Sequence, residues 1–403
     1  MRLPSPYDRL LIPVYVPSFL MAISNQAMLL LLPLYALHIL NNPAFAALVV
    51  GCRGLGILIF DVPAGMLAGR FGDKAVLLGG LITHALVMIS LAIVSEQWLL
   101  PLLAVPLGGG MAAWFLGRQS YITDTCAAGE RGRAIAVTAG VNRFGTFIGP
   151  LAGGFVAELF GYSVAFAAGA VFAVAAAVIV LTFTHNIRPE QAPKTTVLAV
   201  IGRTLNSNRW LFATAGFTAM TIQLMRATQQ LLVPLFGTLV GLEIATIGLI
   251  YSLCAALDMS LFYPVGVVMD RWGRKWTGVP SMLVFVLGLT LLPLAQGFYS
   301  LLMAGLVLAF ANGLSTGIVM IVGMDMAPSD QRGQFLGVWR LLGDMGVVGG
   351  PLLAGVLVNI ATLATASFAA AGLGLLGAGS FLFLVPETLH YSHKRDAEKR
   401  RFR

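Results

Sequence analysis

The chain has 403 residues, of which 58% are hydrophobic and only 10% are charged, and its formal net charge is +8. A water-soluble domain of this composition would expose large apolar patches, so the composition excludes a soluble globular protein and indicates a membrane protein. The basic excess does not indicate nucleic-acid binding, because the lysines and arginines outside the apolar segments lie on alternate loops.

Twelve apolar segments are long enough to cross a bilayer, which takes roughly 20 helical residues. In chain order we expect membrane spans over 10–40, 44–69, 75–95, 98–125, 134–159, 162–184, 209–240, 243–270, 276–296, 298–326, 334–360 and 363–385. The first segment lacks a small-residue cleavage site, so we expect it to remain as a helix. The prediction is an all-α membrane protein.

The basic residues mark one side of the membrane. They fall, in chain order, at Arg2 and Arg9, Arg70 and Lys74, Arg131 and Arg133, Arg188 to Arg209, Arg271 to Lys275, Arg332, and Lys394 to Arg403. The opposite loops contain neither lysine nor arginine. The positive-inside rule therefore predicts cytoplasmic termini and an even number of spans. We expect a monomeric multi-pass protein surrounded by membrane lipid, in a bacterial inner membrane.

The sequence repeats itself at an offset of 201 residues. At this offset Pro33 aligns with Pro234, Pro63 with Pro264, Arg70 with Arg271, Lys74 with Lys275, Asp124 with Asp325, and Pro150 with Pro351. The repeat predicts two pseudo-symmetric six-helix bundles, 1–184 and 209–386, with a cytoplasmic linker 185–208 and a basic cytoplasmic tail 387–403. Duplicated six-helix halves are typical of secondary transporters that bind substrate between the halves.

Two motifs stand out in this repeat. The loop after the eighth span contains Gly266, Asp270, Arg271, Gly273, Arg274 and Lys275, and the loop after the second span contains Gly65, Arg70, Gly72 and Lys74. The fifth span contains Gly145, Gly149, Pro150, Gly153 and Gly154. Small residues let two helices approach closely, and a proline bends its helix.

These motifs resemble those of the major facilitator superfamily, and the fifth span resembles its drug/proton antiporter branch. The resemblance implies twelve helices, alternating access, and a loop motif that helps to latch the cytoplasmic side. The first-half loop departs from the motif, because Gly69 stands in place of the aspartate and Asp73 in place of a basic residue. The helix 4 arginine that the family links to proton coupling is missing near Val105, and its role does not transfer to Arg118.

Eight charged residues fall in the expected hydrocarbon region, away from the ends of the spans, where each costs about 2.5–3.5 kcal/mol or more unless it has a partner or water. They are Arg53, Asp61, Arg118, Arg143, Arg226, Asp258, Arg340 and Asp344. The resemblance implies that the second span meets the eleventh and the fifth meets the eighth. Asp61 and Arg340 then lie at similar depths, roughly 12–14 Å from the cytoplasmic end, and Arg143 and Asp258 lie at roughly 15–18 Å.

We predict that these two pairs, with Asp344 and Arg118, serve proton coupling and gating; permanent structural ion pairs are the alternative. Polar residues of the outer halves are the predicted substrate contacts: Asn25, Gln26, Arg53, Gln223, Arg226 and Gln229. Five arginines against three aspartates leave the expected cavity positive. Anionic or zwitterionic amphiphiles therefore weigh equally with lipophilic cations as substrates.

Together these features predict a proton-coupled efflux antiporter of small amphipathic organic compounds, with protons as the coupling ion. A symporter or uniporter that imports a small metabolite stays open as an alternative, and so does a membrane sensor without transport. We expect no enzyme activity, because no span carries a cluster of catalytic residues. We also expect no cofactor, metal or nucleic acid, and no direct use of ATP, because no Walker motif occurs.

Overall fold

The structure, a computed structural model, describes residues 9–127, 129–185, 197–328 and 331–389. The described residues are helical and are joined by short turns, as an all-α chain requires. Parts of the expected linker and tail, residues 186–196 and 390–403, lie outside the described residues, as do Arg2 and Arg188.

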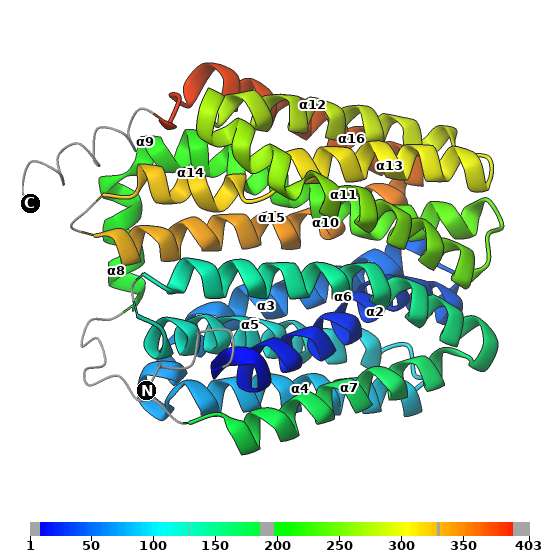
Figure 1. The fold of residues 1–403 in the computed structure, drawn as a ribbon. Helices are drawn as coiled ribbons and strands as arrows, with labels where there is room; N and C mark the ends of the chain where they lie inside the picture. Colours follow the sequence, from blue (N-terminus) through cyan, green and yellow to red (C-terminus); the bar gives the residue numbers. More distant parts are fainter. Residues whose placement is uncertain (1–8, 128, 186–196, 329–330, 390–403) are drawn as a thin grey trace, which may run out of the picture. The chain divides into compact units, whose positions relative to one another are not determined.

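Twelve long helical segments of the described chain correspond to the twelve expected spans. They are η1 (Leu11–Tyr15) with α2 (Val16–Leu40), α3 (Pro43–Phe71), α4 (Asp73–Ile93), α5 (Leu99–Thr125), α6 (Arg131–Phe160), α7 (Tyr162–Phe183), α9 (Arg209–Leu211) with η2 (Phe212–Gly216) and α10 (Phe217–Leu239), α11 (Ile244–Trp272), α12 (Lys275–Leu291) with η3 (Leu292–Leu294), α13 (Phe298–Leu314) with α14 (Ile318–Met326), α15 (Arg332–Ile360), and α16 (Leu363–Gly379) with η4 (Ser380–Leu384) (Figure 1). A short helix, α8 (Val197–Ser207), precedes the seventh of them.

Ten of these segments are long and apolar enough to cross a membrane by themselves. The two others, α6 and α10, carry an arginine among polar neighbours: Arg143 follows Asn142, and Arg226 lies between glutamines. A helix with polar residues on one face can still span a bilayer when neighbouring helices cover that face. All ten apolar segments match expected spans to within a few residues.

The tenth expected span, 298–326, is broken rather than continuous. The helix α13 ends at Leu314 and α14 begins at Ile318. Gly317 between them adopts a left-handed conformation with φ of 75°, which favours glycine because it lacks a Cβ. A helix break leaves backbone carbonyls without helical partners, so polar side chains are needed to satisfy them.

The described chain forms two compact units. The first comprises residues 1–193 with 237–255, and the second comprises 194–236 with 256–403, as far as these ranges are described. Within the first unit, α5 packs closely on both α3 and α4, and α2 packs on α6. A Cβ at Gly108 would collide with the backbone of Arg53, so glycine is required where α3 and α5 touch.

The contact between α4 and α5 in the first unit corresponds to the contact between α12 and α14 in the second. The small and the large residue of this contact have changed places between the two units. In the first unit, a Cβ at Gly117 of α5 would lie 3.0 Å from the backbone nitrogen of Leu77 in α4. In the second unit, a Cβ at Gly278 of α12 would lie 2.5 Å from Cδ1 of Ile318 in α14. Leu77 aligns with Gly278 and Gly117 with Ile318 at the 201-residue offset. One small and one large residue therefore meet at each crossing.

Candidate functional site

A buried arginine without a carboxylate partner lies in the first unit. Arg53 of α3 is only 7% exposed and donates from Nη2 to Oδ1 of Asn25 in α2, at 3.2 Å. Its Nε has no hydrogen-bond partner among the described residues, and no described carboxylate pairs with it. The structure thus brings together two of the predicted substrate contacts. A buried guanidinium left in this state favours an anionic group beside it.

Neutral hydrogen bonds hold the surroundings of Arg53 in place. His84 of α4 is fully buried, and its Nε2 lies 3.1 Å from Oγ of Ser24. The Ser24 hydroxyl donates to the carbonyl of Gly169 in α7, at 2.9 Å. Gln26, the residue after Asn25, donates to Oγ1 of Thr146 in α6, at 2.6 Å. The four helices α2, α4, α6 and α7 therefore fix this region of the first unit.

Arg118 of α5 is a second buried cation in the first unit. It is 6% exposed, and its Nη1 donates to Ser18 and to Asn142, at 3.3 Å each. Its guanidinium lies over the rings of Trp114 and Phe115, with centroids at 5.6 and 5.5 Å. Such rings stabilise a cation without neutralising its charge. Sequence reasoning missed Ser18, which lies 100 residues earlier on α2, and Asn142, which lies 24 residues later on α6.

In the second unit, Arg226 caps the break in the tenth span. Its Nη2 donates to the carbonyl oxygen of Ser315 at 2.9 Å and to the Ser315 hydroxyl at 2.7 Å. Its Nη1 donates to Oε1 of Gln223, one turn earlier on α10, at 3.0 Å. The arginine thereby adds a charge-assisted contact to the Ser315 carbonyl, which also accepts from the backbone nitrogen of Ile318 at 3.2 Å. Gln229 lies half-buried on the same helix.

Asp258 of α11 reaches the same break from another side. The hydroxyl of Thr316 donates to Oδ1 of Asp258, at 3.5 Å. Thr316 follows Ser315, so a cation on α10 and an anion on α11 contact consecutive residues of the break. The sequence predicted both charged residues but placed them in separate sites.

The remaining predicted carboxylates are also partly enclosed. Asp61 of α3 is 7% exposed. Asp344 lies on α15, where its Oδ2 is 3.7 Å from Nε of Arg340 one turn earlier. The predicted pairs Asp61–Arg340 and Arg143–Asp258 join residues of different units and stay predictions.

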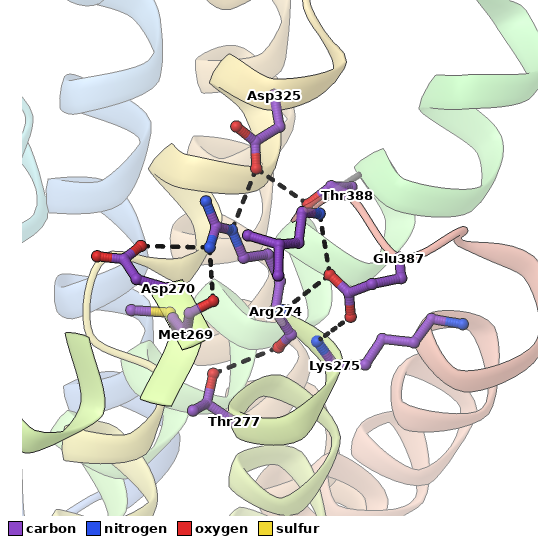
Figure 2. Close-up of polar contacts among 9 residues, drawn as sticks. Met269, Asp270, Arg274, Lys275, Thr277, Asp325, Glu387 and Thr388 are labelled. Atoms are coloured by element: carbon purple, nitrogen blue, oxygen red, sulfur yellow. Dashed lines mark hydrogen bonds and ion pairs between the residues drawn. The ribbon is translucent and has the colours of Figure 1, made fainter. Parts of the chain in front are cut away.

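The loop motif of the second unit forms a network around Arg274, which is drawn in Figure 2. Arg274 pairs through Nε with Oδ2 of Asp325 in α14, at 3.2 Å, and through Nη1 with Oδ1 of Asp270, at 3.3 Å. Nη1 also donates to the carbonyl of Met269. The Thr388 hydroxyl donates to the same Asp325 oxygen, at 3.0 Å. One guanidinium therefore ties the loop before α12 to α14.

Glu387, which follows the last helix, completes this network. Its Oε1 accepts from the backbone nitrogen of Arg274 at 2.8 Å, and its Oε2 accepts from that of Lys275 at 3.0 Å. Burial raises the pKa of Glu387, but the backbone N–H groups of Lys275, Arg274, Leu389 and Thr388 outweigh burial, so the pKa is lowered. The carboxylate sits at the N-terminus of α12, where the helix dipole favours negative charge.

The two loop motifs share one further contact. Lys275 donates from Nζ to the carbonyl of Leu382, and Lys74 donates in the same way to Leu181, both at 2.7 Å. Each lysine thereby holds the end of the last helix of its repeat. Sequence reasoning identified both lysines but missed Asp325, Glu387 and Thr388 as part of the motif. The repeat alignment of Asp124 with Asp325 was the signal that pointed to one of them.

The glycines of the fifth span allow α6 to lie directly against α2. A Cβ at Gly149 would lie 2.7 Å from the carbonyl oxygen of Ile23, and one at Gly153 would lie 2.6 Å from Cβ of Ala27. The second unit repeats the contact, since a Cβ at Gly350 would lie 2.7 Å from the carbonyl oxygen of Leu224. These glycines are therefore packing residues in both repeats.

The start of α11 packs on α6 inside the first unit. A Cβ at Gly154 would lie 2.9 Å from the carbonyl oxygen of Ile244, and a Cβ at Gly248 would collide with the carbonyl of Pro150. The Ser252 hydroxyl donates to the carbonyl of Phe147, at 2.7 Å. This contact agrees with the expected meeting of the fifth and eighth spans.

Comparisons with known proteins agree with this architecture. The chain matches the sequence profile of the Major Facilitator Superfamily over residues 15–263 and 215–402. It is 24% identical over 324 residues to the multidrug resistance protein MdtH of Yersinia pestis (strain Pestoides F), which covers 77% of either chain. The same values hold for MdtH of Yersinia pseudotuberculosis serotype O:3 (strain YPIII).

Solved structures of transporters share the fold. A POT family transporter in complex with a thioalcohol-conjugated peptide superposes with a TM-score of 0.77 at 11% identity, over 91% of this chain and 94% of that one. A mutant form of the nucleoside transporter NupG superposes with a TM-score of 0.76 at 16% identity, over 91% and 98%. The chain therefore belongs to the major facilitator superfamily, with its all-α fold of twelve transmembrane helices, and is a membrane transporter rather than an enzyme.

Proposed function

We propose that this transporter exports small amphipathic organic compounds that carry an anionic or zwitterionic group, in exchange for protons, by alternating access. In this scheme the protein works as a monomer in a bacterial inner membrane with both termini in the cytoplasm. Resemblance to multidrug resistance proteins supports export. The placement of the loop lysines and arginines on alternate loops supports the orientation.

The proposal of an anionic or zwitterionic substrate rests on one observation: Arg53 is buried without a carboxylate partner. Moving a guanidinium from water into a protein interior is costly, and a neutral Asn25 offsets that cost only in part. A carboxylate, sulfonate or phosphate on the substrate would complete the hydrogen bonding of Arg53, including the unsatisfied Nε. An apolar body on the same substrate would suit the hydrophobic surroundings.

The break in the tenth span supports a link between substrate and proton. Arg226 and Asp258 contact the neighbouring residues Ser315 and Thr316. Protonation of Asp258 would remove the negative charge on one side of the break and alter how the other side holds Arg226. Asp61, which is buried in the first unit, is the second candidate carrier.

Substrate binding by Arg53→Gln tests the substrate class. We expect this variant to lose roughly 10- to 100-fold in affinity for anionic amphiphiles, the value of a charge-assisted hydrogen bond, and to bind neutral analogues as before. Arg133→Gln, which changes an exposed arginine of α6, is the matched control. Calorimetric titration of purified protein with matched anionic, neutral and cationic compounds measures the effect. Equal affinities of Arg53→Gln and wild type for the anionic series would refute the assignment.

A further inference from the structure

The first unit lacks the cation around which the loop motif of the second unit is built. At the 201-residue offset, Arg274 aligns with Asp73 and Asp325 aligns with Asp124. An arginine–aspartate ion pair in the second unit is thus replaced by two aspartates in the first. Asp270, the other partner of Arg274, aligns with Gly69 and has no counterpart carboxylate.

The two aspartates belong to helices that touch at this point. Asp73 begins α4, and a Cβ at Gly117 of α5 would lie 3.4 Å from its carbonyl oxygen. Residues Gly117, Ser120 and Asp124 are spaced by three and four positions, so they share one face of α5. The Ser120 hydroxyl and the Asp124 carboxylate are the side chains near enough to Asp73 to affect its protonation.

Asp73 is completely buried, at 0% exposure, while Asp124 is exposed. Neither carboxylate oxygen of Asp73 has a well-formed hydrogen bond among the described residues. Burial disfavours an ionised carboxylate in that state, although the N-terminus of α4 offsets part of the cost, and a second carboxylate nearby adds repulsion. A positively charged species is therefore missing from the place that a guanidinium fills in the second unit.

Three basic side chains at this end of the first unit have contacts other than Asp73. Lys74 donates to the carbonyl of Leu181 on α7. Arg70 at the end of α3 lies over the Phe71 ring, at 5.3 Å from the centroid, and Arg131 donates to the carbonyl of Cys126. The exposed His185 follows α7. No described cation pairs with Asp73.

We propose that Asp73 and Asp124 form a proton-binding site, in which one carboxyl takes up a proton as the pH falls to mildly acidic values and donates a hydrogen bond to the other. The proton takes the place of the Arg274 guanidinium and lets α4 and α5 close at their cytoplasmic ends. Exposed Asp124 gives the proton a route to solvent. The site is distinct from Asp61 and Asp258, and its existence does not depend on the direction or coupling of transport.

Infrared spectroscopy of the full-length protein in lipid nanodiscs tests the site directly. We expect a protonated-carboxyl band at mildly acidic pH that is lost as the pH rises through neutral to alkaline values. Asp73→Asn and Asp124→Asn should each abolish this band, whereas Asp270→Asn, in the matching loop of the second unit, should retain it. A band that survives both first-unit substitutions would overturn the proposal.

The substitution Asp73→Arg rebuilds the ion pair of the second unit and gives an independent readout. The wild-type melting temperature should fall by a few degrees as alkaline pH removes the proton and leaves two like charges together. That fall should vanish in Asp73→Arg and in the smaller change Asp73→Asn. An unchanged alkaline fall in both variants would overturn the proposal. A wild-type melting temperature that rises with sodium at fixed pH and ionic strength would instead assign the site to a metal cation.

Discussion

At the scale of single residues, the charged side chains of this transporter differ in what surrounds them. Arg274 has two carboxylates, Arg226 has carbonyl and hydroxyl groups, and Arg53 has one amide. A guanidinium between two carboxylates is a structural ion pair, whereas one with a single neutral partner can still accept an anionic ligand. On this basis we propose a latch role for Arg274 and a substrate-binding role for Arg53.

A prediction for coupling follows from Asp258. Asp258→Asn mimics the protonated carboxyl, so the pH dependence of transport should flatten while some downhill movement of substrate persists. Glu243→Gln, an exposed carboxylate in the loop before the same helix, is the control and should keep the wild-type pH profile. Initial transport rates in proteoliposomes over a pH series measure both. Wild-type pH dependence in Asp258→Asn would exclude this residue as the carrier.

Glu387 gives a prediction for stability at acidic pH. Its pKa in the folded protein is lowered from the usual 4.5, so it stabilises the fold above that pH and the contribution is lost as pH falls through the folded value. We expect Glu387→Gln to lower the melting temperature at neutral pH and to weaken the decline of the wild type below about pH 4.5. Thermal unfolding followed by intrinsic fluorescence across pH measures it. Parallel curves for the two proteins would contradict this role.

At the scale of helices, hydropathy and the 201-residue repeat predicted the spans well. Each expected span has a helical segment with ends within a few residues, because the length of an apolar run is a local property. The break at Ser315 and Thr316 was missed, since those residues lie inside a continuous apolar run and Gly317 alone does not mark a break. The contacts of Glu387 with Arg274 and Lys275 were also missed, because they join positions more than 100 residues apart.

Because α6 packs closely on α2, we expect that adding one methyl group at Gly149 of α6 destabilises the protein. Gly149→Ala would push its Cβ against the carbonyl oxygen of Ile23, 2.7 Å away, and should cost about 1–3 kcal/mol of stability. Gly140→Ala on the same helix meets open space and should be neutral or slightly stabilising, since alanine favours helix. Melting temperatures of the two variants in one detergent give the comparison. Equal melting temperatures would show that α6 and α2 are not in backbone contact.

At the scale of the whole molecule, the sequence predicted the superfamily and the duplicated design, and the profile match confirms the superfamily. The candidate site was predicted in part: Asn25 with Arg53, and Gln223 with Arg226, are brought together as side-chain pairs. Thr146, which accepts from Gln26, and Ser315, which accepts from Arg226, were not predicted, because neutral hydroxyl residues are common in helices and give no signal of their own. Exchange of substrate for protons remains the central proposal.

The most direct measurement of that exchange uses proteoliposomes that contain the purified protein, an imposed pH gradient and no other gradient. The account predicts that an anionic or zwitterionic amphiphile accumulates on the acidic side, against its own gradient, while protons move the opposite way. Collapse of the pH gradient by a protonophore should abolish the accumulation. Accumulation on the alkaline side, with protons and substrate moving together, or transport that ignores the gradient, would contradict it.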